Sequence, residues 1–305
     1  MLSVLCPCYN EDKSVNLLYN RVVSVMENSD EKFQIFFVDD GSRDNTLDIL
    51  KNIASNDERV KVIEFSRNFG FEPALTALLD YSEGDAVVII DADLQHPPEV
   101  IPSMIAKWRE GFDIVYTKRK NRNSNGIVRK FLTSYFYKIY NAVSEAHIIE
   151  GTGEFCLMDR RVVNAVLKFN ETHKFMRGIF SWIGFRRTMI DYVCEKRYGG
   201  ESKFTFRKLF ALAFDGLLSF SSFPLKLIFH LGVLSLFGVI FYGITNSFAT
   251  EMFFVLLLFS LNFLCIGIIG MYIGRVYDET KNRPLYIVRE VYSKNHEKNH
   301  EETDS

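Results

Sequence analysis

The sequence predicts an α/β protein with a mostly parallel sheet, followed by interfacial helices and two transmembrane helices. Three observations carry this prediction. Short apolar runs alternate with amphipathic stretches through the first 120 residues, which is typical of a parallel sheet with helical crossovers. Polar clusters follow three of these apolar runs. Two long apolar segments come after residue 223.

The first half of the chain contains the expected strands of the sheet and the helices between them. Each expected strand is short, apolar and bounded by a breaker, and each expected helix has an apolar face. The expected strands cover residues 2–6, 33–38, 60–65, 86–90 and 113–116, and the expected helices cover 14–26, 46–54, 73–81 and 99–110. The carboxyl ends of such strands lie side by side, so the polar clusters at 9–11, 39–42 and 91–95 should converge on one crevice.

The fourth strand ends in the most informative of these clusters. Asp91 and Asp93 are spaced one residue apart, so in extended chain their side chains point the same way. Two carboxylates there repel each other unless a cation lies between them. Oxygen ligands suit Mg²⁺ or Mn²⁺, which also bind nucleotide phosphates. Two solvated aspartates in a turn are the alternative interpretation.

Composition and missing motifs exclude several classes. The net charge is only −2, so no polyanion such as nucleic acid is expected as a partner. No Gly-x-Gly-x-x-Gly follows the first strand and no Gly-x-x-x-x-Gly-Lys occurs, which argues against a dinucleotide dehydrogenase and a P-loop enzyme. The five cysteines are scattered and lack the pairing of a zinc site, so we expect reduced thiols.

Several blocks resemble family 2 glycosyltransferases of the GT-A fold. They are Pro7-Cys8-Tyr9-Asn10-Glu11, Asp39-Asp40-Gly41-Ser42, Ser66-Arg67-Asn68-Phe69-Gly70 and Asp91-Ala92-Asp93-Leu94-Gln95. The later blocks 153–158, 173–178, 200–203 and 272–279 resemble the polyprenyl-phosphate glycosyltransferases. Within them the sequence is most similar to the bactoprenol glucosyl transferases of O-antigen (lipopolysaccharide) glucosylation, and more distantly to dolichol-phosphate mannose synthase.

This resemblance implies roles in donor binding. Pro7, Tyr9 and Glu11 would line the nucleoside pocket, and Asp91 and Asp93 would hold a metal ion, Mg²⁺ or Mn²⁺, on the diphosphate of the nucleotide sugar. Gln95 would lie near the sugar.

The Asp39-Asp40 pair would contact the nucleoside. Asp40 would accept a hydrogen bond from the uracil imide, and Asp39 would support the ribose or its loop. The alternative is an Asx-turn that caps the next helix, but Asp44 or Asn45 is better placed for that cap. His96 is not included among the metal ligands.

The same resemblance implies an acceptor site. Arg129 and Thr133 are four residues apart, on one face of an expected helix, and would hold the lipid phosphate; a solvated helix face is the alternative. The expected catalytic residues are Asp93, Glu154, Arg129 and Lys203. Glu154 stands where relatives usually carry Asp, and we expect it to position the site, paired with a cation such as Arg129 or Lys203, rather than to act as a base.

The C-terminal third is expected to meet a membrane. Residues 203–222 predict an interfacial helix with cations at its start. Segments 227–245 and 252–273 carry no Asp, Glu, Lys or Arg, and at about 1.5 Å per residue each can cross a core of about 30 Å. Lys and Arg flank the pair but are missing from the loop between them, which places both flanks in the cytosol.

Together these features predict four segments: a cytosolic GT-A catalytic domain (1–200), interfacial helices (201–226), a transmembrane hairpin (227–274) and a cytosolic tail (275–305). The expected location is the inner membrane, multi-pass, with both termini cytosolic. The expected reaction is metal-dependent, inverting transfer of glucose from UDP-glucose to undecaprenyl phosphate. The resemblance also implies a homo-oligomer, a tetramer. Mannose, galactose, an aminosugar, or a non-catalytic nucleotide-binding membrane module are the alternatives.

Overall fold

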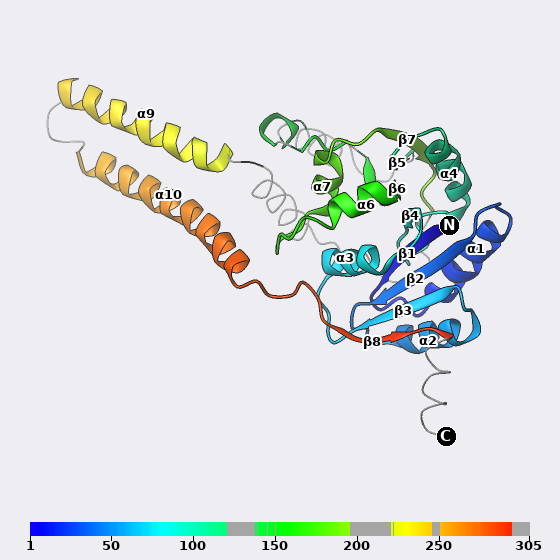
Figure 1. Cartoon of the computed structure of the whole chain (residues 1–305). Coiled ribbons are helices and arrows are strands. Elements are labelled where there is room, and N and C mark those ends of the chain that lie inside the picture. The colour runs from blue at the N-terminus through cyan, green and yellow to red at the C-terminus, as the bar shows by residue number, and fades with distance from the viewer. Residues whose placement is uncertain are drawn as a thin grey trace.

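The structure is a computed structural model, and it describes residues 1–120, 138, 140–144, 146–149, 151–195, 221, 223–245 and 251–294. A mixed sheet of eight strands forms the centre, in the order β7-β5-β6-β4-β1-β2-β3-β8 (Figure 1). The pairs β4–β1, β1–β2, β2–β3 and β5–β7 are parallel. The predicted, mostly parallel sheet is therefore confirmed.

The predicted strands and helices of the first half are all present, with small shifts at their ends. The strands are β1 (Leu2–Cys8), β2 (Phe33–Asp39), β3 (Val60–Phe65), β4 (Ala86–Ile89) and β5 (Ile114–Arg119). The helices are α1 (Val15–Glu27), α2 (Thr46–Asn56), α3 (Phe71–Tyr81), the 3₁₀ turn η1 (Pro98–Val100) and α4 (Ile101–Arg109).

Strand β1 continues through Pro7, where we expected it to stop. The carbonyl of Leu5 accepts from Ile90 on the β4 side, and the carbonyl of Cys8 accepts from Asp40 on the β2 side. Because residues alternate along a strand, Pro7 faces the β4 side, where the β1–β4 pairing ends at Leu5. The missing N–H of proline therefore costs no ladder bond.

The elements after β5 are β6 (Thr152–Asp159), α6 (Arg160–Val166), α7 (Met176–Trp182), β7 (Arg187–Tyr192), α9 (Phe223–Thr245), α10 (Glu251–Thr280) and β8 (Val288–Tyr292). Of these, α9 and α10 fall in segments that the sequence analysis predicted as helices, and the others were not predicted. Strand β6 runs antiparallel between β4 and β5, and β8 runs antiparallel on the outer edge of β3. Part of the predicted C-terminal tail therefore belongs to the catalytic sheet.

Two apolar layers hold the sheet. Helices α1, α2 and α4 pack on one face through residues such as Leu18, Leu50 and Met104. Helices α3, α6 and α7 pack on the other face through residues such as Leu78, Val163 and Ile179. Because both faces are covered, the central strands are apolar throughout rather than alternating.

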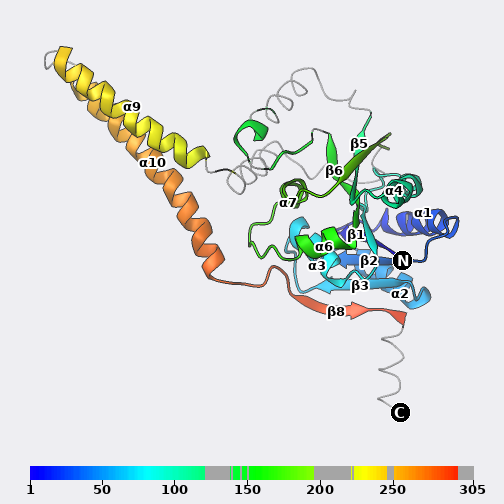
Figure 2. The ribbon, with the colours of Figure 1, turned by 45° about the horizontal axis from the view of Figure 1, so that its top comes forward.

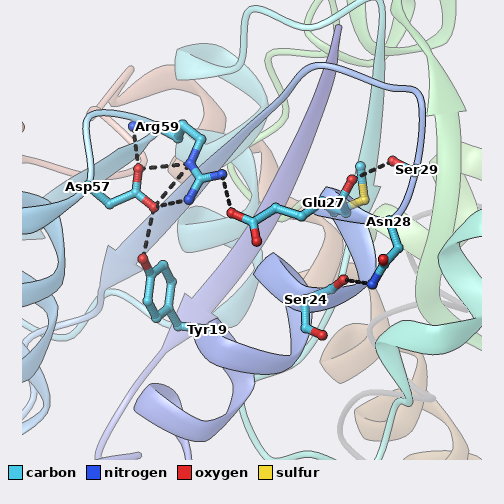
Figure 3. A network of polar contacts seen from close by, with 8 residues as sticks. Tyr19, Ser24, Glu27, Asn28, Ser29, Asp57 and Arg59 are labelled. Atoms are coloured by element: carbon cyan, nitrogen blue, oxygen red, sulfur yellow. Dashed lines mark hydrogen bonds and ion pairs between the residues drawn. The ribbon is translucent and has the colours of Figure 1, made fainter.

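A polar network fixes the end of the sheet opposite to the strand ends that carry the motifs (Figure 3). Arg59 donates to Asp57 at 2.8 Å and to Glu27 at 3.0 Å, and the Tyr19 hydroxyl donates to Asp57 at 2.8 Å. These contacts join α1, the end of α2 and the start of β3. This end of the sheet is therefore closed by structural ion pairs.

Helices α9 and α10 lie side by side and extend away from the sheet (Figure 2). Leu261–Thr280 is the one stretch of the described chain long and apolar enough to cross a membrane, and Phe223–Ser235 is a shorter apolar stretch. Large side chains are open to solvent on both helices, among them Phe229, Phe237, Phe259 and Phe263. Helices are thus present where two were predicted, and the described residues give one candidate span.

Candidate active site

The site lies between β1 and β4, where the order in which the chain adds strands to the sheet reverses. The chain runs from β1 to β2 on one side of this point and from β4 to β5 on the other, and in such sheets the carboxyl ends of the two strands border a crevice. The loop after β1 is tied to the loop after β2: the Asn10 amide donates to the Ser42 hydroxyl at 3.0 Å, and the Glu11 amide donates to the Thr46 hydroxyl at 2.8 Å. Asn10 holds a left-handed backbone, with φ of 53°. The predicted convergence is therefore confirmed for the clusters at 9–11 and 39–42, and the cluster at 91–95 follows β4, the strand next to β1.

Three carboxylates lie close enough to interact electrostatically at the end of β4. Asp91 and Asp93 follow β4, and β6 brings Glu154 to the same edge because Ile89 pairs with Cys156. Burial, Glu154 and Asp93 raise the pKa of Asp91 to about 7, although Arg119 and Arg177 oppose the shift. The amide of Gln95 donates to Asp93 at 3.0 Å. This is a strand end with excess negative charge.

A divalent cation fits this excess. No group of three or more His, Cys, Asp or Glu side chains that could hold a metal ion occurs among the described residues. Asp91 and Asp93 would supply two oxygen ligands, which leaves positions for diphosphate oxygens and water. That arrangement is usual for Mg²⁺ in nucleotide sites.

Among the described residues, Glu154 pairs with Arg177, a cation that the sequence analysis did not name. Its Oε1 accepts from Arg177 of α7 at 2.6 Å, whereas Arg129 and Lys203, the expected partners, lie outside the described residues together with Thr133. Burial and Glu154 raise the pKa of nearby Glu72 to about 8, and Arg177 opposes that shift. Arg177 therefore acts as the counter-ion for this end of the site.

His96 is a site residue that sequence reasoning left out. It is 2% exposed, stacks on Phe155 with ring centroids 4.9 Å apart, and its Nε2 lies 3.1 Å from Arg119 Nη2. Burial and Arg119 lower the pKa of His96 to about 3, so the ring is neutral. Since Nε2 accepts from Arg119, the proton belongs on Nδ1, which lies 3.4 Å from Asp91 Oδ2.

A cavity of about 340 Å³ lies beside the loops after β1 and β2. It is lined by Tyr9, Asp39, Gly41, Ser42, Arg43, Leu47, Glu64, Phe65, Ser66, Arg67, Asn68 and Arg289. Of the residues predicted to bind the donor, Tyr9 and Asp39 line this cavity. Pro7 lies in β1, and the Glu11 carboxylate accepts from Ser14 at 3.0 Å, at the start of α1.

The two aspartates after β2 have different surroundings. Asp40 accepts from the amides of Phe69 at 2.6 Å and Gly70 at 3.0 Å, so it holds the loop after β3 rather than lining the cavity. Asp39 is 1% exposed, accepts from the Ser42 amide through Oδ2, and its Oδ1 has no hydrogen-bond partner in the described structure. Burial raises the pKa of both carboxyls. The geometry favours Asp39 over Asp40 as the ligand acceptor.

The hydrogen bond at the start of α2 is made by Asp44 rather than by Asp39 or Asp40, as predicted. Asp44 Oδ1 accepts from the Thr46 amide at 3.0 Å, at the start of α2. Asp39 and Asp40 are therefore not needed for that cap, and both remain with the loops that border the crevice.

A doubly wound sheet with carboxylates at its switch point, and a cavity at the same edge of the sheet, is the usual setting of a nucleotide site. Comparison with known proteins agrees with this: the family model described as "Glycosyl transferase family 2" matches residues 3–167. The chain belongs to glycosyltransferase family 2, it is a glycosyltransferase, and with the observed sheet this confirms the expected GT-A fold.

Relatives match over nearly the whole chain. An uncharacterized glycosyltransferase, YkcC of Bacillus subtilis, is 41% identical over 302 residues, covering 95% of this chain and 94% of that protein. The bactoprenol glucosyl transferase of Shigella phage SfII is 38% identical, covering 96% and 99%. A mannosyl-3-phosphoglycerate synthase structure from Rubrobacter xylanophilus is 18% identical, covers 70% of this chain and 71% of that chain, and has a TM-score of 0.49.

Proposed function

We propose that this glycosyltransferase moves a hexose, glucose from UDP-glucose, onto undecaprenyl phosphate at the cytosolic face of a membrane. The observation that carries the proposal is the closeness of the Asp91, Asp93 and Glu154 carboxylates at the end of β4, on the same edge of the sheet as the cavity that Asp39 lines. Relatives named bactoprenol glucosyl transferase support the polyprenyl acceptor and the glucosyl group.

The choice of a uridine nucleotide as the sugar donor follows from the residues that line the cavity. A buried carboxylate oxygen that still lacks a partner suits an N–H donor such as the uracil imide. Asp39 is therefore our acceptor for the base, and Tyr9 lies beside it in the same cavity. Asp91 and Asp93 would hold the divalent ion on the diphosphate, and the ion would supply positive charge for the departing UDP.

The transfer step needs little proton chemistry. A phosphate monoester has a second pKa near 6, so it is mostly dianionic at neutral pH. One acceptor oxygen would attack the anomeric carbon opposite UDP, the bond from that carbon to the diphosphate would break, and the configuration would invert. Glu154, held by Arg177, would position the site. Arg129, Thr133 and Lys203 remain the proposed acceptor-phosphate and catalytic residues.

The membrane part of the proposal rests on exposed apolar surface. Helices α9 and α10 expose phenylalanines along their length, and a surface of this kind is covered by lipid or by another protein. We propose that 227–274 form a membrane hairpin and that 201–226 lie at the interface.

The test is a donor panel. Membranes that contain the protein are incubated with undecaprenyl phosphate, Mg²⁺ and labelled UDP-glucose, UDP-galactose, UDP-N-acetylglucosamine or GDP-mannose, and label in the lipid phase is counted. We expect the most transfer from UDP-glucose. Label from another nucleotide alone would reassign the sugar, and no label from any would contradict the proposal.

A further inference from the structure

The chain beyond the hairpin returns to the catalytic sheet. The Ser66 amide donates to the Ile287 carbonyl at 3.0 Å, and the Tyr286 ring stacks on Phe65 with centroids 5.2 Å apart. Strand β8 then pairs with β3 (Figure 1). The donor cavity thus has a wall that comes from the far end of the sequence.

A β-bulge in β8 lies at this cavity. Glu64 pairs with Glu290 and Phe65 pairs with Val288, so Arg289 is the extra residue between the two pairs. Bulges re-aim side chains and are common beside active sites. The Arg289 side chain lines the cavity, and its Nη1 lies 3.1 Å from Glu64 Oε1.

Arg289 is connected to the buried Asp39 through Glu64, across the adjacent strands β2, β3 and β8. Asp39 of β2 pairs with Glu64 of β3 in the parallel ladder, and Glu64 contacts Arg289 of β8. The Tyr292 hydroxyl also donates to Glu64, at 2.6 Å, so Glu64 keeps a partner without Arg289. The Arg289 side chain is 70% exposed, so a ligand in the cavity can reach its guanidinium.

We propose that Arg289 donates to the O4 keto oxygen of the donor base while Asp39 accepts from the adjacent N3–H, an inference that rests on the proposed function. Uracil presents the O4 acceptor beside the N3–H donor. Cytosine presents a 4-amino donor beside an N3 acceptor, so both contacts would meet the wrong partner. The strand beyond the membrane hairpin thus sets the preference for uridine nucleotides over cytidine nucleotides.

Binding of UDP and CDP to the full-length protein in detergent, with Mg²⁺, tests this role. Arg289→Met should weaken UDP binding about tenfold or more, as expected for loss of a charge-assisted hydrogen bond. The ratio of UDP to CDP affinity should fall by a similar factor. Arg283→Met, on the same segment, and Tyr292→Phe, which removes a different Glu64 contact of β8, should bind both nucleotides like the parent protein.

Three outcomes would overturn the inference. Unchanged UDP affinity and an unchanged UDP-to-CDP ratio in Arg289→Met would remove Arg289 from the base contact. An equal loss in Tyr292→Phe would assign the effect to the Glu64 contacts that hold β8. If the parent protein binds UDP no better than CDP, or not at all, the proposed donor site fails together with the inference, whereas tight UDP binding with an indifferent Arg289 leaves the donor site standing.

Discussion

At the scale of single residues, the Glu154 side chain could serve as a positioning group or as a general base. Its ion pair with Arg177, at 2.6 Å, suits a positioning group, and a dianionic acceptor needs no strong base. We predict that Glu154→Gln keeps measurable transfer with the same acidic limb in its pH–rate profile, set by the acceptor phosphate near pH 6. Arg177→Met should lower the rate similarly. Near-complete loss, with an acidic limb that vanishes in the residual rate, would instead make Glu154 the base.

The raised pKa of Glu72 leads to a separate prediction about how stability depends on pH. Its pKa rises from 4.5 to about 8 in the folded protein because of burial and Glu154. The folded state then binds its proton more tightly than the unfolded state, so this group lowers stability as pH rises from about 4.5 to about 8. Glu72→Gln should therefore gain about 1–3 kcal/mol relative to the parent protein at the upper end of this window, with little gain at the lower end.

Thermal unfolding across that pH window measures the effect. Glu58→Gln, at the opposite end of the sheet, controls for the loss of one negative charge. Parallel curves for Glu72→Gln and the parent protein would contradict the assignment of a raised pKa to Glu72.

Among the elements, the loops after β2 and β3 depend on one glycine. Gly41 has φ of +66°, and a Cβ there would lie 2.6 Å from the Asn68 amide nitrogen. Gly41→Ala should cost about 1–3 kcal/mol of stability and weaken UDP binding, because both loops line the cavity. Gly153→Ala, where a Cβ meets nothing within 4 Å, is the matched control for unfolding. Equal stability of the two variants would show that the loops separate without cost.

The parallel half of the sheet was predictable because each strand is an apolar run buried on both faces. Strands β6 and β8 were not, because residues such as Glu154 and Arg289 face the site or the sheet edge and interrupt the apolar pattern. Which of Asp39 and Asp40 faces the cavity depends on where the loop at 68–70 packs, and neighbouring residues alone cannot show that. Arg177 lies in a block that resembled the family, but its pairing with Glu154 needs the fold.

For the whole molecule, the return of β8 bears on topology. The chain enters the α9–α10 hairpin from the catalytic domain and rejoins the same sheet afterwards, so both ends of the hairpin lie on one side. This supports the proposal that both termini are cytosolic. A cysteine placed at Ser305 should resist a membrane-impermeant thiol reagent in intact cells and react after permeabilisation. Efficient labelling of intact cells would overturn the topology and the access to cytosolic UDP-sugars.

The central claim is that the end of β4 is a metal-dependent centre for sugar transfer to a polyprenyl phosphate. The most direct measurement is labelled-hexose transfer to undecaprenyl phosphate by the parent protein, by Asp93→Asn and by Asp12→Asn, each shown to be folded. We predict transfer by the parent protein and Asp12→Asn, abolished by EDTA and restored by Mg²⁺ or Mn²⁺, and loss by orders of magnitude in Asp93→Asn. Full activity of the parent protein after verified metal removal, or of Asp93→Asn, would contradict the account.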